Sequence, residues 1–194
     1  MFGIFKKKSA KQADADQPKT VFHTDVGMLC LWNCSTYKHI TDYDTWEPEF
    51  VEDEDIIRNI KKGTYVPINI RSDGVYGAEV KFGGNATLNE RERTYLIASS
   101  QPYLIKTDGR IALSGMEHVG SDLTDDIRVF DVEPGEYAVS IHLIDWGKEP
   151  GSTGPDGEPS ANALPDFVVI VQPRDETISV IRQEVETFNR DGAH

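Results

Sequence analysis

Apolar and polar residues alternate with a period of two along much of the chain, which is the pattern of half-buried β-strands. The clearest case is the segment 137–143, in which every second residue is apolar. The segment 26–32 is apolar on both faces, which is typical of a central strand. Strand patterns occur, in chain order, at 26–32, 66–70, 76–82, 94–98, 103–106, 110–113, 127–132, 137–146 and 167–171. Short strands in this number predict a mainly β fold, an antiparallel β-sandwich of about eight or nine strands.

Residues that favour tight turns separate several of these strands. Asp-Gly occurs at 73–74 and at 108–109, and Glu-Pro-Gly-Glu occupies 133–136. Because each of these turns joins two alternating segments, the pattern predicts three β-hairpins. Pro67 has no backbone N–H to donate to a neighbouring strand, so 66–70 is expected to be a sheet edge or the start of a strand.

Two helices are predicted beside the strands. Residues 52–62 carry acids in the first turn and two lysines in the last, and Gly63 follows as the stop. This order matches the helix macrodipole, so a short helix is expected there. The C-terminal segment has apolar residues at spacings of three, four and three, the pattern of one helical face. They are Ile178, Ile181, Val185 and Phe188.

The two ends of the chain differ in composition from its middle. Residues 1–19 are mostly polar after the first five, which predicts a disordered tail. A single β-sandwich domain is expected over 20–175, followed by a C-terminal helix and frayed end over 176–194. The apolar residues at the start precede the lysines, the reverse of a secretory signal, so a cytoplasmic location is expected.

Acidic residues outnumber basic ones by 33 to 20, which gives a formal net charge of −13. An acidic surface repels a phosphate backbone, so direct binding to nucleic acid is not expected. The charge is compatible with a basic protein partner. No run of 18 apolar residues occurs, so stable membrane insertion is not expected either. Cys30 and Cys34 would lie about 13 Å apart along an extended strand, beyond the reach of a disulfide, and are expected to be free thiols.

Motifs of the common catalytic sites are absent from the sequence. It has no Gly-x-Ser-x-Gly elbow, phosphate-binding loop or dinucleotide fingerprint. We therefore predict no catalytic residue, no resident metal and no cofactor, and do not expect an enzyme. An alternative is a metal-binding or hydrolytic domain that uses His118 and its acidic neighbours. These neighbours are Glu117, Asp122, Asp125 and Asp126. A solvated acidic loop is the explanation that such bunched charges favour.

The segment 42–55 is the most acidic part of the chain and contains eight carboxylates and three aromatic residues. Aromatic side chains anchor interfaces, and carboxylates steer a basic partner toward them. The residues predicted to bind a partner are Tyr43, Asp44, Trp46, Glu47, Glu49, Phe50, Glu52 and Asp53. The alternative is that the aromatic side chains enter the core while the acids face solvent.

Two longer segments resemble a known family. They are Tyr-Leu-Ile-Lys-Thr-Asp-Gly-Arg-Ile-Ala-Leu at 103–113 and Ile-Arg-Val-Phe-Asp-Val-Glu-Pro-Gly-Glu-Tyr-Ala-Val at 127–139. Both are similar to the competence nuclease inhibitor family (the ComJ, or Nin, type), and the resemblance extends over about 66–171. It implies a small cytosolic β-sandwich protein that binds and restrains a DNA-degrading nuclease.

Three classes of function follow from these patterns. The first is an inhibitor or immunity-type protein that binds a basic partner such as a nuclease or toxin. The second is the metal-binding or hydrolytic domain around His118. The third is a structural module that forms homo-oligomers through its sheet edges or its C-terminal helix. The acidic stretch, the Gly/Pro-rich loop 147–159 and the C-terminal extension depart from the family pattern, so no family contact residue is carried over.

Overall fold

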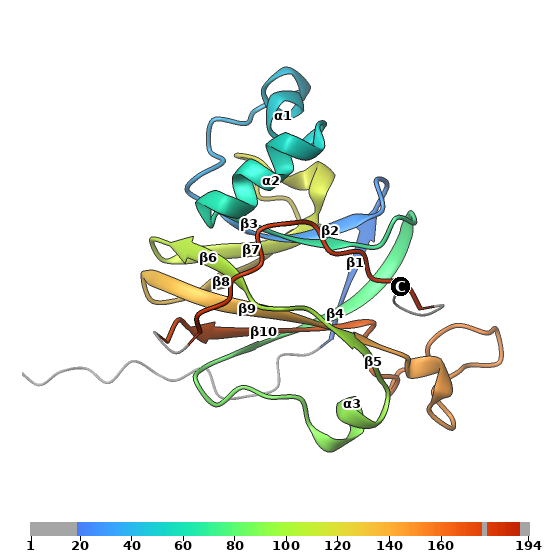
Figure 1. Ribbon diagram of the computed structural model, residues 1–194. Helices are drawn as coiled ribbons and strands as arrows, with labels where there is room; N and C mark the ends of the chain where they lie inside the picture. Colours follow the sequence, from blue (N-terminus) through green and yellow to red (C-terminus); the bar gives the residue numbers. More distant parts are fainter. Residues whose placement is uncertain (1–18, 176–177, 191–194) are drawn as a thin grey trace, which may run out of the picture.

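Two β-sheets packed face to face form the core of the protein (Figure 1). The computed structural model describes residues 19–175 and 178–190. Sheet A contains, in spatial order, β1 (Thr20–Thr24), β4 (Gly74–Phe82), β10 (Phe167–Pro173), β9 (Gly135–Ile144) and β5 (Leu96–Ser99), with β6 (Tyr103–Thr107) also paired to β9. Sheet B contains β3 (Tyr65–Asn69), β2 (Met28–Asn33), β7 (Arg110–Gly115) and β8 (Arg128–Asp131). The predicted mainly β sandwich is confirmed; β1 is the strand that the alternation did not predict.

Both faces of the central strand β2 are buried, as its sequence predicted. The side chains on one face point into the space between the two sheets. The other is covered by α1 (Tyr43–Phe50) and α2 (Asp53–Lys62), which lie on the outer face of sheet B (Figure 1). Pro67 lies in β3 at the edge of sheet B, where the prediction placed it. Cys30 and Cys34 are buried free thiols, which confirms the prediction that they do not form a disulfide.

The three predicted hairpins are wrong, because each of the three turns carries the chain from one sheet to the other. β3 pairs with β2 in sheet B, whereas β4 pairs with β1 and β10 in sheet A. In the same way β6 and β9 belong to sheet A, and β7 and β8 pair in sheet B. An alternating pattern identifies a strand but does not state which strand lies beside it. β10 and β4 run parallel, whereas the other strand pairs named here are antiparallel.

Helix α2 confirms the prediction for 52–62, and Gly63 ends it with a left-handed φ of 74°. Two further helices, α1 and α3 (Glu90–Thr94), were not predicted. Each begins with a reciprocal capping box, formed by Asp42 with Thr45 and by Asn89 with Glu92. Two short 3₁₀ helices, η1 (Met116–His118) and η2 (Trp146–Lys148), follow β7 and β9.

The predicted C-terminal helix is wrong for the residues that the structure describes. Residues 178–190 contain no helix and lie along the edges of both sheets, with isolated bridges from Arg182 to Tyr103 and from Thr187 to Asn69. The Phe188 N–H donates to the Asn69 carbonyl over 2.8 Å, so contacts with the sheets replace helical hydrogen bonds. The Phe188 side chain is 3% exposed and packs on Phe167. The predicted tail at 1–19 lies outside the described residues except for Lys19.

Candidate functional site

The acidic segment forms helix α1, and its first residue outside the helix fixes where it begins. The Asp42 carboxylate accepts the Thr45 N–H over 3.0 Å, and the Thr45 hydroxyl accepts the Asp42 N–H over 3.2 Å. The Thr45 side chain and N–H both bond the Asp42 carboxylate, and these hydrogen bonds lower its pKa. An ionised cap at this position satisfies N–H groups that the helix itself leaves unpaired.

A row of aromatic rings connects α1 to the core. Phe50 packs on Tyr65 with ring centroids 5.2 Å apart, and Trp46 lies 5.6 Å from Phe50. Tyr43 stacks on Trp46 at 6.0 Å. Exposure rises along this row, from 1% for Phe50 to 63% for Tyr43. The Trp46 indole N–H donates to the Met116 carbonyl over 3.1 Å, which fixes the middle of the row against η1.

Hydrogen bonds join α1 and α2 into one unit. The buried Asn59 amide donates to the Glu49 carbonyl over 3.0 Å and to the Glu49 carboxylate over 3.1 Å. Arg58 donates to the Pro48 carbonyl over 3.1 Å and also pairs with Asp55, a bond that raises the Arg58 pKa. Glu49 therefore holds the two helices together, whereas Asp55 pairs with Arg58 within α2. Both carboxylates already have partners inside the protein.

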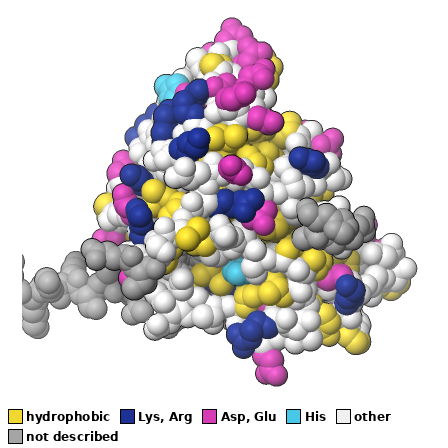
Figure 2. Space-filling view, viewed as in Figure 1, with side chains coloured by type: hydrophobic (Ala, Val, Ile, Leu, Met, Phe, Trp, Pro, Cys, Tyr) yellow, Lys and Arg dark blue, Asp and Glu magenta, His cyan; other side chains and the backbone are white. Residues whose placement is uncertain are grey.

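Six acids of the segment are exposed. Apart from Asp42, which caps α1, they lie at the end of the molecule that α1 and α2 form (Figure 2). We call this surface the acidic tip; it comprises Asp44, Glu47, Glu52, Asp53 and Glu54. Tyr43 lies beside it and donates its hydroxyl to the Glu47 carboxylate over 3.3 Å. The negative charge of Glu47 raises the Tyr43 pKa.

The eight residues predicted to bind a partner thus separate into three groups. Five of them are exposed, namely Tyr43, Asp44, Glu47, Glu52 and Asp53. Trp46 and Glu49 are half-buried and take part in contacts within the protein. Phe50 belongs to the core, where no partner reaches it in this structure.

A groove of about 480 Å³ runs beside α1. One side is formed by Ile40, Tyr43 and Trp46, and the other by the segment 117–124 that follows β7. Its lining is Val26, Ile40, Thr41, Asp42, Tyr43, Trp46, Glu117, His118, Val119, Gly120, Ser121, Asp122 and Thr124. The Ser121 N–H donates to the Ile40 carbonyl over 2.8 Å and holds the two sides together.

The groove brings together residues that the sequence assigned to two different hypotheses. Tyr43 and Trp46 come from the predicted partner-binding set, whereas His118 and Asp122 come from the metal-binding alternative. They are more than 70 residues apart, so no local pattern connects them. Asp125 and Asp126 are exposed and do not line the groove.

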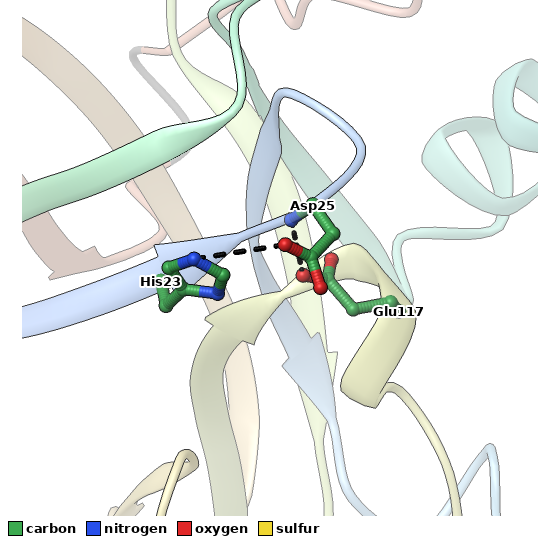
Figure 3. A group of neighbouring side chains, drawn as sticks. All are labelled: His23, Asp25 and Glu117. Carbon is green, nitrogen blue, oxygen red and sulfur yellow. Dashed lines mark hydrogen bonds and ion pairs between the residues drawn. The ribbon is translucent and has the colours of Figure 1, made fainter.

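Two groupings of side chains of chemical interest were not predicted, although Glu117 was part of the metal-binding alternative around His118. Ser99 and His142 lie on neighbouring strands, with the Ser99 hydroxyl 2.8 Å from the His142 Nδ1. Burial lowers the His142 pKa, and its Nε2 is buried without a hydrogen-bond partner. His23, Asp25 and Glu117 form the second group, near the end of β1 (Figure 3). The pairing of β5 with β9 brings Ser99 beside His142, and the contact of η1 with the end of β1 brings Glu117 to His23 and Asp25. Neither contact appears as residue spacing.

Comparison with known proteins finds solved structures of similar fold. No protein-family model and no curated protein matches the chain. A solved structure described as crocagin biosynthetic gene J is similar, with a TM-score of 0.59 and 14% sequence identity over 83% of this chain and 99% of the other. ComJ of Bacillus subtilis, described as the inhibitor of the DNA-degrading activity of NucA, is similar with a TM-score of 0.50 and 8% identity over 82% and 98%.

These comparisons agree with the resemblance seen in the sequence. Both solved chains are covered almost completely, so the likeness extends over the whole sandwich and not one motif. The chain therefore shares the fold of ComJ and of the crocagin biosynthetic protein.

A separate finding concerns membranes: no helix of the described residues is long and apolar enough to cross one.

Proposed function

We propose that this protein is a cytoplasmic inhibitor or immunity-type protein that binds a basic protein, such as a nuclease or toxin, through the acidic tip and the adjoining groove. One observation carries the proposal: α1 and α2 present the five acids of the acidic tip together with the exposed ring of Tyr43, which lines a groove, on a fold shared with a nuclease inhibitor. The proposal needs no cofactor and no catalytic residue. It also needs no direct contact with nucleic acid.

The charges of the acidic tip are suited to steering a basic partner. Like charges gathered on one surface produce a potential that accelerates the encounter with an oppositely charged protein. A nuclease that binds DNA carries basic side chains in its substrate groove, because these neutralise the phosphates. The carboxylates that α1 and the start of α2 present offer such a groove an alternative to DNA.

The aromatic row supplies the second part of recognition. Tyr43 is a large exposed side chain whose ring is held in place by Trp46. Binding through a side chain that is already held loses less conformational entropy than binding through a mobile one. The groove between Trp46 and Val119 is mostly apolar on its floor and suits an apolar side chain of the partner.

The proposal is tested with purified NucA as the probe, in a DNA-degradation assay. The wild-type protein is expected to inhibit NucA, and the double variant Asp44→Lys with Glu47→Lys is expected to weaken inhibition at least tenfold, about 1.4 kcal/mol. Circular dichroism of the variant shows whether the fold is kept.

The matched control reverses the charge of two exposed acids outside the proposed surface. Glu90 begins α3 and Glu158 lies in the loop after η2, and both are exposed. The double variant Glu90→Lys with Glu158→Lys has the same net charge as the test variant and is expected to inhibit as the wild type does. Absence of inhibition by the wild-type protein contradicts the proposed function, and equal losses in both double variants contradict the proposed surface.

A further inference from the structure

Three potential metal ligands meet where the chain passes from sheet A to sheet B (Figure 3). His23 lies in β1 of sheet A, Asp25 lies in the turn that follows, and Glu117 lies in η1 after β7 of sheet B. One ligand atom from each lies within 4.8 Å of the other two. The His23 Nε2 and Asp25 Oδ1 atoms are 3.6 Å apart. Ligands of a tetrahedral zinc ion bind at about 2.0–2.2 Å, so a modest closure of the three side chains brings them to ligand spacing.

The Glu117 carboxylate is already oriented toward this point. Its Oε1 accepts the Asp25 N–H over 2.8 Å, and its Oε2 accepts the Thr24 hydroxyl over 3.2 Å. Thr24 is fully buried, and its hydroxyl also contacts the Met28 carbonyl. A carboxylate oxygen that accepts one hydrogen bond keeps a second lone pair for a metal. Such supporting hydrogen bonds are characteristic of metal ligands, because they fix the ligand before the ion arrives.

We propose that His23, Asp25 and Glu117 form a binding site for a divalent transition-metal ion of the zinc class. One imidazole nitrogen and two carboxylate oxygens match the ligands of zinc, whereas calcium and magnesium take oxygen ligands. Three protein ligands leave the fourth tetrahedral position to water. The other explanation of the cluster is an ion pair between protonated His23 and Asp25, which needs no metal.

The bound ion would join the two sheets beside the groove. Asp25 precedes Val26, and Glu117 precedes His118; Val26 and His118 both line the groove. The site therefore fixes two parts of the groove relative to each other. This inference does not depend on the proposed inhibitor function, because it rests on the three ligands alone.

The test uses the full-length, untagged protein after treatment with EDTA and dialysis. Titration calorimetry with ZnCl₂ is expected to give one ion per chain. At a free zinc concentration of about 100 times Kd, the Tm is expected to rise by about 5–10 °C. The same concentrations of CaCl₂ and MgCl₂ are expected to leave the Tm unchanged.

Two histidine variants make the test specific. His23→Gln is expected to weaken zinc binding at least tenfold. His39→Gln is the matched control, since the His39 side chain is as exposed as that of His23, at 54%, and lies 3.4 Å from Glu49. Glu49 is also near the Arg58 cation, at 3.5 Å, which disfavours a metal there, so the control is expected to bind zinc as the wild type does. Both changes are at exposed side chains and leave the core intact.

Three results would overturn the site. They are an unchanged Tm with zinc, wild-type zinc affinity in His23→Gln, and loss of zinc binding in His39→Gln. Asp25→Asn provides a second check that does not involve histidine, because an amide oxygen is a weaker ligand than a carboxylate. Its zinc affinity is expected to fall as well, and unchanged affinity would contradict the assignment of Asp25.

Discussion

Individual side chains of the acidic segment differ sharply in what they contribute, and Phe50 and Tyr43 show the extremes. Both belong to the same aromatic row, but Phe50 is 1% exposed and Tyr43 is 63% exposed. The sequence predicted an aromatic cluster among acids, which is correct. It did not separate the anchor in the core from the ring on the surface, because Tyr43, Trp46 and Phe50 recur at i, i+3 and i+7 on one face of the helix. A shared face does not state which of its two ends meets the core.

This difference predicts opposite effects of truncation. Phe50→Ala is expected to lower the free energy of unfolding by about 3–5 kcal/mol, because it leaves a cavity among packed rings. Tyr43→Ala is expected to change it by no more than about 0.5 kcal/mol, since the ring is mostly in water. Urea denaturation of both variants measures the two values. Equal losses would show that the row does not run from the core to the surface.

The lowered pKa of His142 predicts that the stability of the protein depends on pH. Burial lowers its pKa from 6.5 in the folded protein, so near that pH the unfolded chain binds more protons than the folded one. The free energy of unfolding therefore falls as the pH drops from about 7 through about 6.5 toward the folded-state pKa. Glu136 and Glu149 have lowered pKa values that act in the same direction, but only below 4.5.

The measurement is the Tm of the wild-type protein and of His142→Gln between pH 7.5 and 5. The variant is expected to lose less stability over this range, because glutamine does not titrate. Parallel curves for the two proteins would show that His142 does not produce the acid sensitivity.

Among the elements, the C-terminal segment differs most from expectation. Its apolar residues recur as in a helix, yet the described residues run along both sheets. Phe188 packs on Phe167, and the edge strands β6 and β3 offer hydrogen-bond partners to Arg182 and Thr187. Burial of an apolar side chain together with free strand edges outweighs the modest preference of a short isolated helix.

Tyr103 is central to the attachment of this segment. Its hydroxyl donates to the Glu184 carbonyl over 3.0 Å and accepts the Glu186 N–H over 3.2 Å, and burial raises its pKa to about 12. Tyr103→Phe is expected to accelerate hydrogen exchange at the Glu186 and Phe188 amides and to cost about 1 kcal/mol of stability. Unchanged exchange at both amides would show that the segment is held without this hydroxyl.

The strands show what local pattern can and cannot predict. Alternation located β4 and β9, a dense apolar run located β10, and the edge position of β3 followed from Pro67. The partners of the strands did not follow, because the same alternation suits either sheet and the turns at 73–74 and 108–109 connect layers. Helix α1 carried a readable signal, since Asp42 and Thr45 have the spacing of a capping box.

At the scale of the whole molecule, the shared fold and the distribution of charge on its surface are separate features. The two sheets provide a rigid frame that is shared with ComJ at 8% identity, so the frame tolerates almost complete replacement of its side chains. The helices that carry the acidic tip, α1 and α2, lie on the outer face of sheet B (Figure 1). The net charge of −13 predicted an acidic surface. The concentration of acids at 42–55 is visible in the sequence, but the position of this segment beside 117–124 depends on tertiary contacts that the sequence does not display.

The most direct measurement of the central claim is the association rate constant with NucA as a function of salt. Between about 0.1 M and about 1 M NaCl the screening length falls from about 10 Å to about 3 Å, so steering by the acidic tip is largely removed. We expect the rate constant of the wild-type protein to fall steeply over this range. We expect Asp44→Lys with Glu47→Lys to start lower and to depend far less on salt. The same steep dependence in both proteins would contradict recognition through the acidic tip.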